Sequence, residues 1–400
     1  MSDTRVPKSA TPWRLLALLM AMTAMGPVAL NILVPAIPQL ARVLETDSGT
    51  VQLTVSLFLL SLATAQLLLG PLSDRFGRRP VVLAGLSLAV VASFAAIATT
   101  SINALIIARI IQAMGAATGV VIGRAIIRDL FERDRAASML GLVATAMVVA
   151  PMVAPLIGGI LDTAFGWHAI FLFVALFSLV VLIWAYVTLP ETAPAPTTER
   201  AQARLWSDWG ALLTSRNFHG YVLAASLGSA QFFTFIGGGP HVVVTQMGRS
   251  SAEYGLWFAI TSLGYMAGNF AASRLSQRYG VNAMIVYGTA FEIVGAAIGV
   301  AAVAMFPDAG PAVIFLPQII ISFGNGVLLP NAIAGAVSVR PHAAGAASGI
   351  TGFVQMAIGA LAAQFIPYAL VGSATPMPMA LALLAFGIAT MAAFLALVRR

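Results

Sequence analysis

Long stretches without a charged residue restrict the fold of this sequence more than any other feature. Uncharged intervals cover residues 15–41, 48–73, 136–161, 163–190, 217–248 and 309–339. Each exceeds the roughly 20 residues that a helix needs to cross a hydrocarbon core of about 30 Å. Only 9% of the 400 residues are charged, against about 25% in soluble proteins. Water could not solvate such a chain in any compact fold, so we expect its solvent to be lipid.

The apolar runs predict helices. Within a bilayer every backbone amide needs an internal partner, and strands of a barrel would show alternating polarity, which these runs lack. The uncharged stretch of residues 341–398 is too long for one crossing and divides at Pro367, Pro376 and Pro378. Residues 80–124 likewise divide near residues 99–103. We therefore predict an all-α membrane protein with twelve transmembrane helices in two pseudo-symmetric six-helix halves.

The domain boundaries follow from one polar segment. Residues 191–216 contain the run Ala-Pro-Ala-Pro-Thr-Thr-Glu-Arg, which is typical of a linker. We predict an N-terminal half (residues 1–190), a cytoplasmic linker (191–217) and a C-terminal half (218–400). The sequence LSDRFG at residues 72–77 is matched by LSQRYG at residues 275–280, each after the second crossing of its half. Such repeats around a central site are typical of secondary transporters.

The basic residues predict the orientation. With the N-terminus inside, all but three of the 21 Lys and Arg residues are cytoplasmic; the exceptions are Arg42, Arg109 and Arg249. This agrees with the excess of positive charge on the cytoplasmic side of membrane proteins. We expect a multi-pass protein of the cell (inner) membrane with both termini cytoplasmic. The net charge of +7 then follows from topology, and we expect no nucleic-acid partner.

Several segments carry a resemblance to a known family. They are GPLSDRFGRR at residues 70–79, RIIQAMG at 109–115 and APLIGG at 154–159. These resemble the signature motifs of the major facilitator superfamily, and the third looks like its antiporter motif on the fifth helix, with Pro151, Pro155, Gly158 and Gly159. Residues 123–129, 324–331 and 344–349 are similar to the bicyclomycin and chloramphenicol resistance branch of drug:proton antiporters. The resemblance implies a cavity between the halves and export of small organic compounds against protons.

The sequence departs from that branch in two places. Asn31 stands before Pro35 at the position where the branch usually has an acid, so an amide replaces the expected proton carrier. Ala150 and Ala154 stand where glycines are usual in the antiporter motif. The first departure leaves open whether transport is coupled to protons.

Arg109 is the candidate for the centre of a substrate cavity. It lies about 12 Å along the fourth predicted helix, where a permanently charged guanidinium requires a cavity or a partner. An arginine that only holds helices together is the alternative. Asn31 is at a similar depth, and Gln112 lies one turn below Arg109. On the seventh helix Gln231 precedes aromatic residues that include Phe235, which could stack on a flat substrate; packing against lipid or the core is the alternative. We predict that the substrate cavity is lined by Asn31, Arg109, Gln112, Gln231 and Phe235.

Two residues are candidates for proton coupling. Glu292 lies about 17 Å along the ninth helix, and burial of a carboxyl group favours its protonated form. A glutamic acid that only bonds a neighbouring helix is the alternative. His241 follows three glycines and a proline near the outer end of the seventh helix, and histidine titrates near neutral pH.

The loop after the second helix is predicted to form a cytoplasmic gate. Asp74 can accept hydrogen bonds from a helix N-terminus, and arginines can bind carboxylates such as Asp129 or Glu132. The alternative is that the arginines serve only to keep the loop inside. The predicted gate residues are Gly70, Asp74, Arg75, Gly77, Arg78, Arg79, Arg124 and Arg128.

These features predict a secondary active exporter of small amphipathic compounds. The sequence has no nucleotide-binding loop, no nucleophile with a base and no metal-ligand spacing, so we expect no enzyme, no metal and no cofactor. The proton gradient would supply the energy, and the partners would be the substrate, protons and lipid around a monomer. A carrier for anionic or zwitterionic metabolites with weak or no proton coupling is the alternative, and a receptor without transport is a remote one.

Overall fold

The computed structural model describes residues 12–131, 133–193, 210–340 and 343–398. Within these ranges the regular elements are helices. The first half contains α1 (Pro12–Asn31), η1 (Val34–Ala36), α2 (Ile37–Val43), α3 (Ser48–Phe76), α4 (Arg78–Ile97), α5 (Ile102–Leu130), α6 (Arg133–Phe165) and α7 (Trp167–Thr188). The second half contains α9 (Arg216–Pro240), η2 (His241–Gln246), α10 (Ser251–Tyr279), α11 (Val281–Met305), α12 (Ala312–Ser338), α13 (Ala344–Leu370) and α14 (Met377–Leu397).

The described helices confirm the expected membrane architecture. Eleven of them are long and apolar enough to cross a bilayer, counting α1 with α2 and α9 with η2 as single spans. The remaining long helix, α10, has 29 residues but includes Glu253, Asn269 and Arg274, which make it less apolar. The predicted break near residues 99–103 lies between α4 and α5. Of the three prolines at the second predicted break, Pro376 precedes α14, whereas Pro367 lies inside α13 and Pro378 in the first turn of α14. Most of the predicted linker lies outside the described residues.

Two glycines at equivalent turns support the internal repeat. Gly77 joins α3 to α4 with φ of 96°, and Gly280 joins α10 to α11 with φ of 80°. A positive φ angle strains any residue that has a Cβ atom, so a sharp turn with this backbone conformation favours glycine. These are the last positions of the two matching six-residue segments, so the sequence repeat corresponds to a repeated backbone turn.

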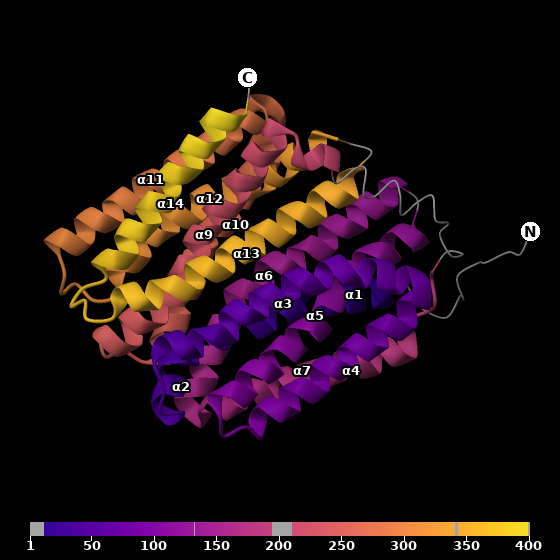
Figure 1. Ribbon diagram of the computed structural model, residues 1–400, viewed down its shortest axis with the longest axis horizontal. Coiled ribbons are helices and arrows are strands. Elements are labelled where there is room, and N and C mark those ends of the chain that lie inside the picture. Colours follow the sequence, from indigo (N-terminus) through magenta and orange to yellow (C-terminus); the bar gives the residue numbers. More distant parts are fainter. Residues whose placement is uncertain (1–11, 132, 194–209, 341–342, 399–400) are drawn as a thin grey trace, which may run out of the picture.

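The two halves lie side by side, with α3 next to α13 and α6 next to α10 across the interface. In Figure 1 the purple helices of the first half occupy one side and the orange and yellow helices of the second half the other. We call the end that carries Arg75, Arg78 and Arg79 the basic end. The opposite end, which carries Asp47 and Asp162, is the far end. At the far end Asp47 caps α3, and the hydrogen bonds from the Thr50 side chain and backbone lower the pKa of its carboxyl group.

The halves contact each other at the far end. A side chain at Gly159 would collide with the backbone of Ser251, and one at Gly255 with the backbone of Pro155, so α6 and α10 approach closely there. Between α3 and α13, Gln364 Nε2 donates to Gly49 O at 2.9 Å. These contacts close the far end of the interface.

A polar cluster reinforces that closure. Ser251 Oγ lies 2.7 Å from Asp162 Oδ2 and 3.1 Å from Pro35 O. The amide nitrogen of Gln39, turned toward the carboxylate, lies 2.9 Å from Asp162 Oδ2. Asp162 is only 5% exposed, so this acid holds α2, α6 and α10 together where the halves meet.

At the basic end, two glycines of the interface helices α3 and α13 have no described neighbour. Gly70 near the end of α3 and Gly345 at the start of α13 both border open space, since a Cβ atom on either would meet no described atom within 4 Å. The same two helices are hydrogen-bonded at the far end. Further in, the two helices still approach each other, since a Cβ atom at Gly352 of α13 would lie 3.9 Å from Gln66 Oε1 of α3, so the open space at these glycines lies toward the basic end.

Candidate functional site

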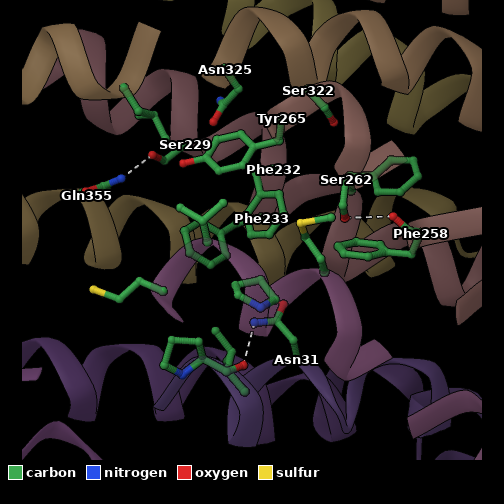
Figure 2. A pocket seen from close by; sticks show the side chains of 18 of the residues that line it. Asn31, Ser229, Phe232, Phe233, Phe258, Ser262, Tyr265, Ser322, Asn325 and Gln355 are labelled. Atoms are coloured by element: carbon green, nitrogen blue, oxygen red, sulfur yellow. Dashed lines mark hydrogen bonds between the residues drawn. The ribbon is translucent and has the colours of Figure 1, made fainter. Parts of the chain in front are cut away.

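A cavity of about 210 Å³ lies between the halves. Helices of both halves form its wall, and Figure 2 shows Asn31 on one side facing Phe232, Phe233 and Tyr265 on the other. The first half contributes mainly aliphatic and methionine side chains: Pro27, Leu30, Leu62, Val120, Met147, Val148, Pro151 and Met152. The described part of the interface thus encloses space deep inside the membrane-spanning region.

The second half gives the cavity an aromatic wall. Phe232, Phe233 and Phe235 lie within one turn of α9, and Phe258 lines the cavity from α10. The ring centroids of Phe232 and Phe258 are 6.2 Å apart, and those of Phe235 and Phe258 are 6.4 Å apart. Tilted rings at these separations are typical of favourable aromatic contacts. A flat apolar group of a bound molecule could join this cluster.

The polar groups of the cavity are neutral. They are Asn31, Gln66, Ser229, Thr261, Ser262, Tyr265, Gln318, Ser322, Asn325 and Gln355. Gln355 Nε2 donates to Ser229 Oγ at 2.5 Å, and Asn31 Nδ2 donates to Pro27 O at 2.8 Å. Asn31 Oδ1 is buried without a partner among the described residues. No Asp, Glu, Lys or Arg is among the described lining residues, so the cavity offers hydrogen bonds without a formal charge.

Two of the five predicted cavity residues, Asn31 and Phe235, line this cavity. The structure does not place Arg109 or Gln112 there. Arg109 is 1% exposed and points into the first half, where Nη1 donates to Ala29 O at 2.8 Å and Nε to Thr54 O at 3.3 Å. Arg109 Nη1 also donates to Gln112 Oε1 at 2.5 Å. The guanidinium carbon lies 4.1 Å from the centre of the Phe58 ring.

Gln112 and Gln231 are likewise engaged in packing. Gln112 Nε2 donates to Ser93 Oγ at 2.7 Å, which extends the Arg109 network to α4. Gln231 Nε2 donates to Leu383 O at 2.7 Å, so this side chain faces α14 and not the cavity. The physical reason is the same in each case: the side chain finds its partner on a neighbouring helix of its own half.

The two predicted proton-coupling residues differ in their surroundings. Glu292 is fully buried and accepts a hydrogen bond from Asn325, a residue of the cavity wall. His241 begins η2 near the far end and is not among the lining residues. The glycines before it are buried and allow close packing, since a Cβ atom at Gly237 would lie 2.5 Å from Ala363 O.

The predicted gate residues form contacts within the first half. Arg78 pairs with the carboxylates of Asp74 and Asp129, and its Nε lies 3.0 Å from Asp129 Oδ2. Arg79 Nη2 donates to Tyr186 O at 2.9 Å. These bonds join the basic ends of α3, α4, α5 and α7, so in this state they do not link one half to the other.

The other gate residues are not gathered around Asp74. Arg75 stacks on the neighbouring Phe76 ring at 5.2 Å. Arg124 Nη2 lies 3.4 Å from Met147 Sδ on α6, and Arg128 is on an exposed face of α5. Among the described residues Asp74 therefore has its ion pair with Arg78 and not with Arg124 or Arg128. Glu132 lies outside the described residues.

Glu191 is a residue that the sequence analysis missed. Its carboxylate accepts hydrogen bonds from the backbone N–H groups of Arg78 at 2.8 Å and Arg79 at 3.2 Å, at the N-terminus of α4. Burial acts to raise the pKa of Glu191, but backbone donation from Ala193, Arg78, Thr192 and Arg79 outweighs it and lowers that pKa. An acid directly after the last helix of the half was the available signal, because helix N-termini attract carboxylates.

The proposed antiporter motif lies at the interface. Pro151 lines the cavity. A side chain at Gly158 would collide with the backbone of Ile32, and one at Gly159 with the backbone of Ser251. Pro155 O faces Gly255 of α10. The motif thus brings α6 close to α1 and to the second half.

A cavity in the membrane-spanning region between two pseudo-symmetric halves defines a secondary transporter. The chain belongs to the Major Facilitator Superfamily, whose sequence model matches residues 17–363. It is 31% identical to Multidrug resistance protein D of Escherichia coli (strain K12), over 85% of each chain. It is 27% identical to a Bicyclomycin resistance protein homolog of Haemophilus influenzae, over 89% of each chain. The crystal structure of a D-xylose-proton symporter superposes with a TM-score of 0.78 over 98% of each chain, at 15% identity.

These comparisons confirm the resemblance, the fold class and the transporter function expected from the sequence. The similarity to the symporter concerns the fold, since the identity is only 15%. The chain is a multi-pass membrane protein of this superfamily, with relatives named for drug resistance.

Proposed function

We propose that this transporter exports small, uncharged, aromatic amphipathic compounds in exchange for protons, by alternating exposure of the cavity. The observation that carries the proposal is the cavity lining, which combines phenylalanines with neutral hydrogen-bonding groups and has no charged side chain among the described residues. The names of the two relatives, which refer to multidrug and bicyclomycin resistance, support the same substrate class.

The position of Arg109 bears on the alternative substrate class. An arginine in the cavity would give it positive potential and would favour anionic or zwitterionic metabolites. Arg109 is directed into the first half and is not in the lining. The cavity therefore lacks the positive charge that would favour an anion, and this supports uncharged substrates.

The proposed orientation in the membrane determines the direction of transport. The basic end faces the cytoplasm, because arginines are retained on that side, and both termini lie there. With the far end closed, compounds enter the cavity from the cytoplasm and leave after the far end opens. The protein works in the inner membrane as a monomer, uses the proton gradient and needs no cofactor. It transports its substrates unchanged and is not an enzyme.

Efflux from cells that lack their own exporters tests this function. Cells expressing the protein should tolerate more bicyclomycin or chloramphenicol and should extrude the compound until a protonophore is added. Thr261→Trp, which fills the cavity, should abolish extrusion. Leu263→Trp is a matched control on the lipid-facing side of α10, where Leu263 is 57% exposed. Export of anionic metabolites without export of neutral compounds would contradict the proposal.

A further inference from the structure

Glu292 lies in the middle of α11 with its carboxyl group turned toward α12. Its side chain is 0% exposed. Asn325 Nδ2 donates to Glu292 Oε1 at 3.1 Å and to Gly228 O at 2.8 Å. Glu292 Oε2 is buried without a partner among the described residues. A buried polar atom without a partner is rare in native proteins and calls for an explanation.

The space around this carboxyl group is formed by glycines. A Cβ atom at Gly324 would lie 2.9 Å from Glu292 Cγ, and one at Gly228 would lie 3.5 Å from Glu292 Oε1. A glutamine would occupy the same space and could accept the same hydrogen bond from Asn325. Packing therefore does not require an acid here. An acid in a membrane-spanning helix also costs free energy.

No described cation compensates Glu292. The helices α12 and α14, which pack on α11, contain no ionisable side chain. The ionisable residues of α9 are close to the basic end, two turns or more from Gly228: Arg216, His219 and Tyr221. The ionisable residues of α10 are Glu253, Tyr254, Tyr265, Arg274, Arg278 and Tyr279, and the described bonds of Glu292 include no hydrogen bond or ion pair with any of them. Besides Glu292, the ionisable residue of α11 is Tyr287, which packs on Tyr279. These surroundings leave the charge of Glu292 to be neutralised by a proton.

Asn325 connects this acid to the cavity. It is a lining residue, and both of its described hydrogen bonds use Nδ2. Its carbonyl oxygen Oδ1 therefore remains to accept a hydrogen bond from a bound molecule, and Figure 2 shows Asn325 beside Ser229 and Tyr265 at the cavity. One planar amide thus contacts the acid with its nitrogen and the cavity with its oxygen.

We propose that Glu292 is a proton-binding site that is coupled to the substrate cavity through the amide of Asn325, an inference that rests on the proposed function. When Glu292 loses its proton, the carboxylate strengthens the hydrogen bond from Nδ2, because bonds to ionised acceptors are stronger. Chained hydrogen bonds polarise one another, so Oδ1 becomes a better acceptor for a substrate donor. Binding a proton reverses this effect.

The sign of this coupling is the one that antiport requires. Substrate bound at Asn325 favours the deprotonated acid, and by reciprocity a proton on Glu292 weakens substrate binding. Asn31 cannot titrate at the position of the acid expected in the first helix. Glu292 supplies an acid in the second half, and Asn325 acts as the positioning residue between it and the substrate.

Infrared spectroscopy of the purified protein in lipid tests the proton site without relying on transport. The wild type should show the C=O band of a protonated carboxylic acid that is absent from Glu292→Gln and disappears as the pH is raised. Asn325→Leu should shift this band, because it removes the hydrogen bond. Thr289→Val is a control one turn away on α11 and equally buried, and it should leave the band unshifted. A band that is absent, or that never titrates, would overturn the proposal.

Binding of chloramphenicol tests the coupling. Its affinity for the wild type should rise with pH by about fivefold or more, the lower end of typical coupling between two sites. Glu292→Gln should bind it with no such dependence, Asn325→Leu should bind it more weakly and also without the dependence, and Thr289→Val should keep the dependence. Wild-type binding that does not vary with pH would refute the coupling. Absence of binding would count against the proposed function, and the infrared titration would still decide whether Glu292 binds a proton.

Discussion

The two halves hold their deeply buried ionisable side chains in different ways. In the first half, Arg109 is bound by two backbone carbonyls and by Gln112, all inside that half. In the second half, Glu292 has one amide partner, Asn325, which also lines the cavity. The wall residues differ as well, being aliphatic and methionine-rich on the first side and aromatic on the second. The first half thus uses its charge to hold helices together, whereas the second half connects its acid to the cavity through Asn325 and lines the cavity with aromatic side chains.

Arg109→Ala should give the largest effect and should act on stability. The change leaves the acceptors on Ala29, Thr54 and Gln112 without the Arg109 donor, and a buried acceptor that loses its donor costs about 1–3 kcal/mol. Thermal unfolding in detergent should show a clear drop in midpoint. Arg124→Ala, on an exposed face of the same helix, is the matched control and should unfold near the wild type. Equal midpoints for Arg109→Ala and wild type would remove the distinction between the halves.

Phe232→Ala should have a smaller effect and should act on binding. An aromatic contact contributes about 0.5–1.5 kcal/mol beyond its buried area, so the dissociation constant for chloramphenicol should rise about tenfold. Equilibrium binding to protein in nanodiscs provides the measurement. The control is Phe270→Ala, since Phe270 is 64% exposed on the lipid-facing side of α10. If both variants weakened binding equally, the aromatic wall would have no special role.

Glu191→Gln should have the smallest effect, outside the membrane-spanning region. The folded-state pKa of Glu191 is lowered, so its contribution to stability is complete above the usual pKa of 4.5 and is lost as the pH falls through the lowered value. The contribution should be less than about 1 kcal/mol, because the group is exposed. Melting temperatures of wild type and variant should therefore differ at neutral pH and converge in acid. A constant difference across that range would disprove the assignment.

The sequence predicted the helices because their limits depend on quantities that it displays directly. The lengths of the uncharged intervals set the number of crossings, and the matching segments at residues 72–77 and 275–280 indicate the internal repeat. Asn31 and Phe235, two of the residues predicted for the substrate cavity, line the cavity between the halves.

The sequence did not predict which neighbour each buried side chain would contact. The depth of Arg109 follows from counting residues along its helix, but its direction around the helix axis depends on how α1, α3 and α5 pack. Gln231 faces α14 for the same reason. Asp162 was missed because its partner Ser251 is 89 residues away in the chain. The link from Glu292 to the cavity depends on Asn325, a contact that no local pattern reveals.

Photo-crosslinking tests most directly whether substrates occupy the cavity between the halves. A chloramphenicol analogue carrying a diazirine should label peptides from both halves, with sites at Met147 or Met152 on α6 and Phe232 or Phe258 on the aromatic wall. Excess unmodified chloramphenicol should prevent this labelling. Labelling that is confined to lipid-facing residues such as Phe270, and that is not prevented by competitor, would contradict the account.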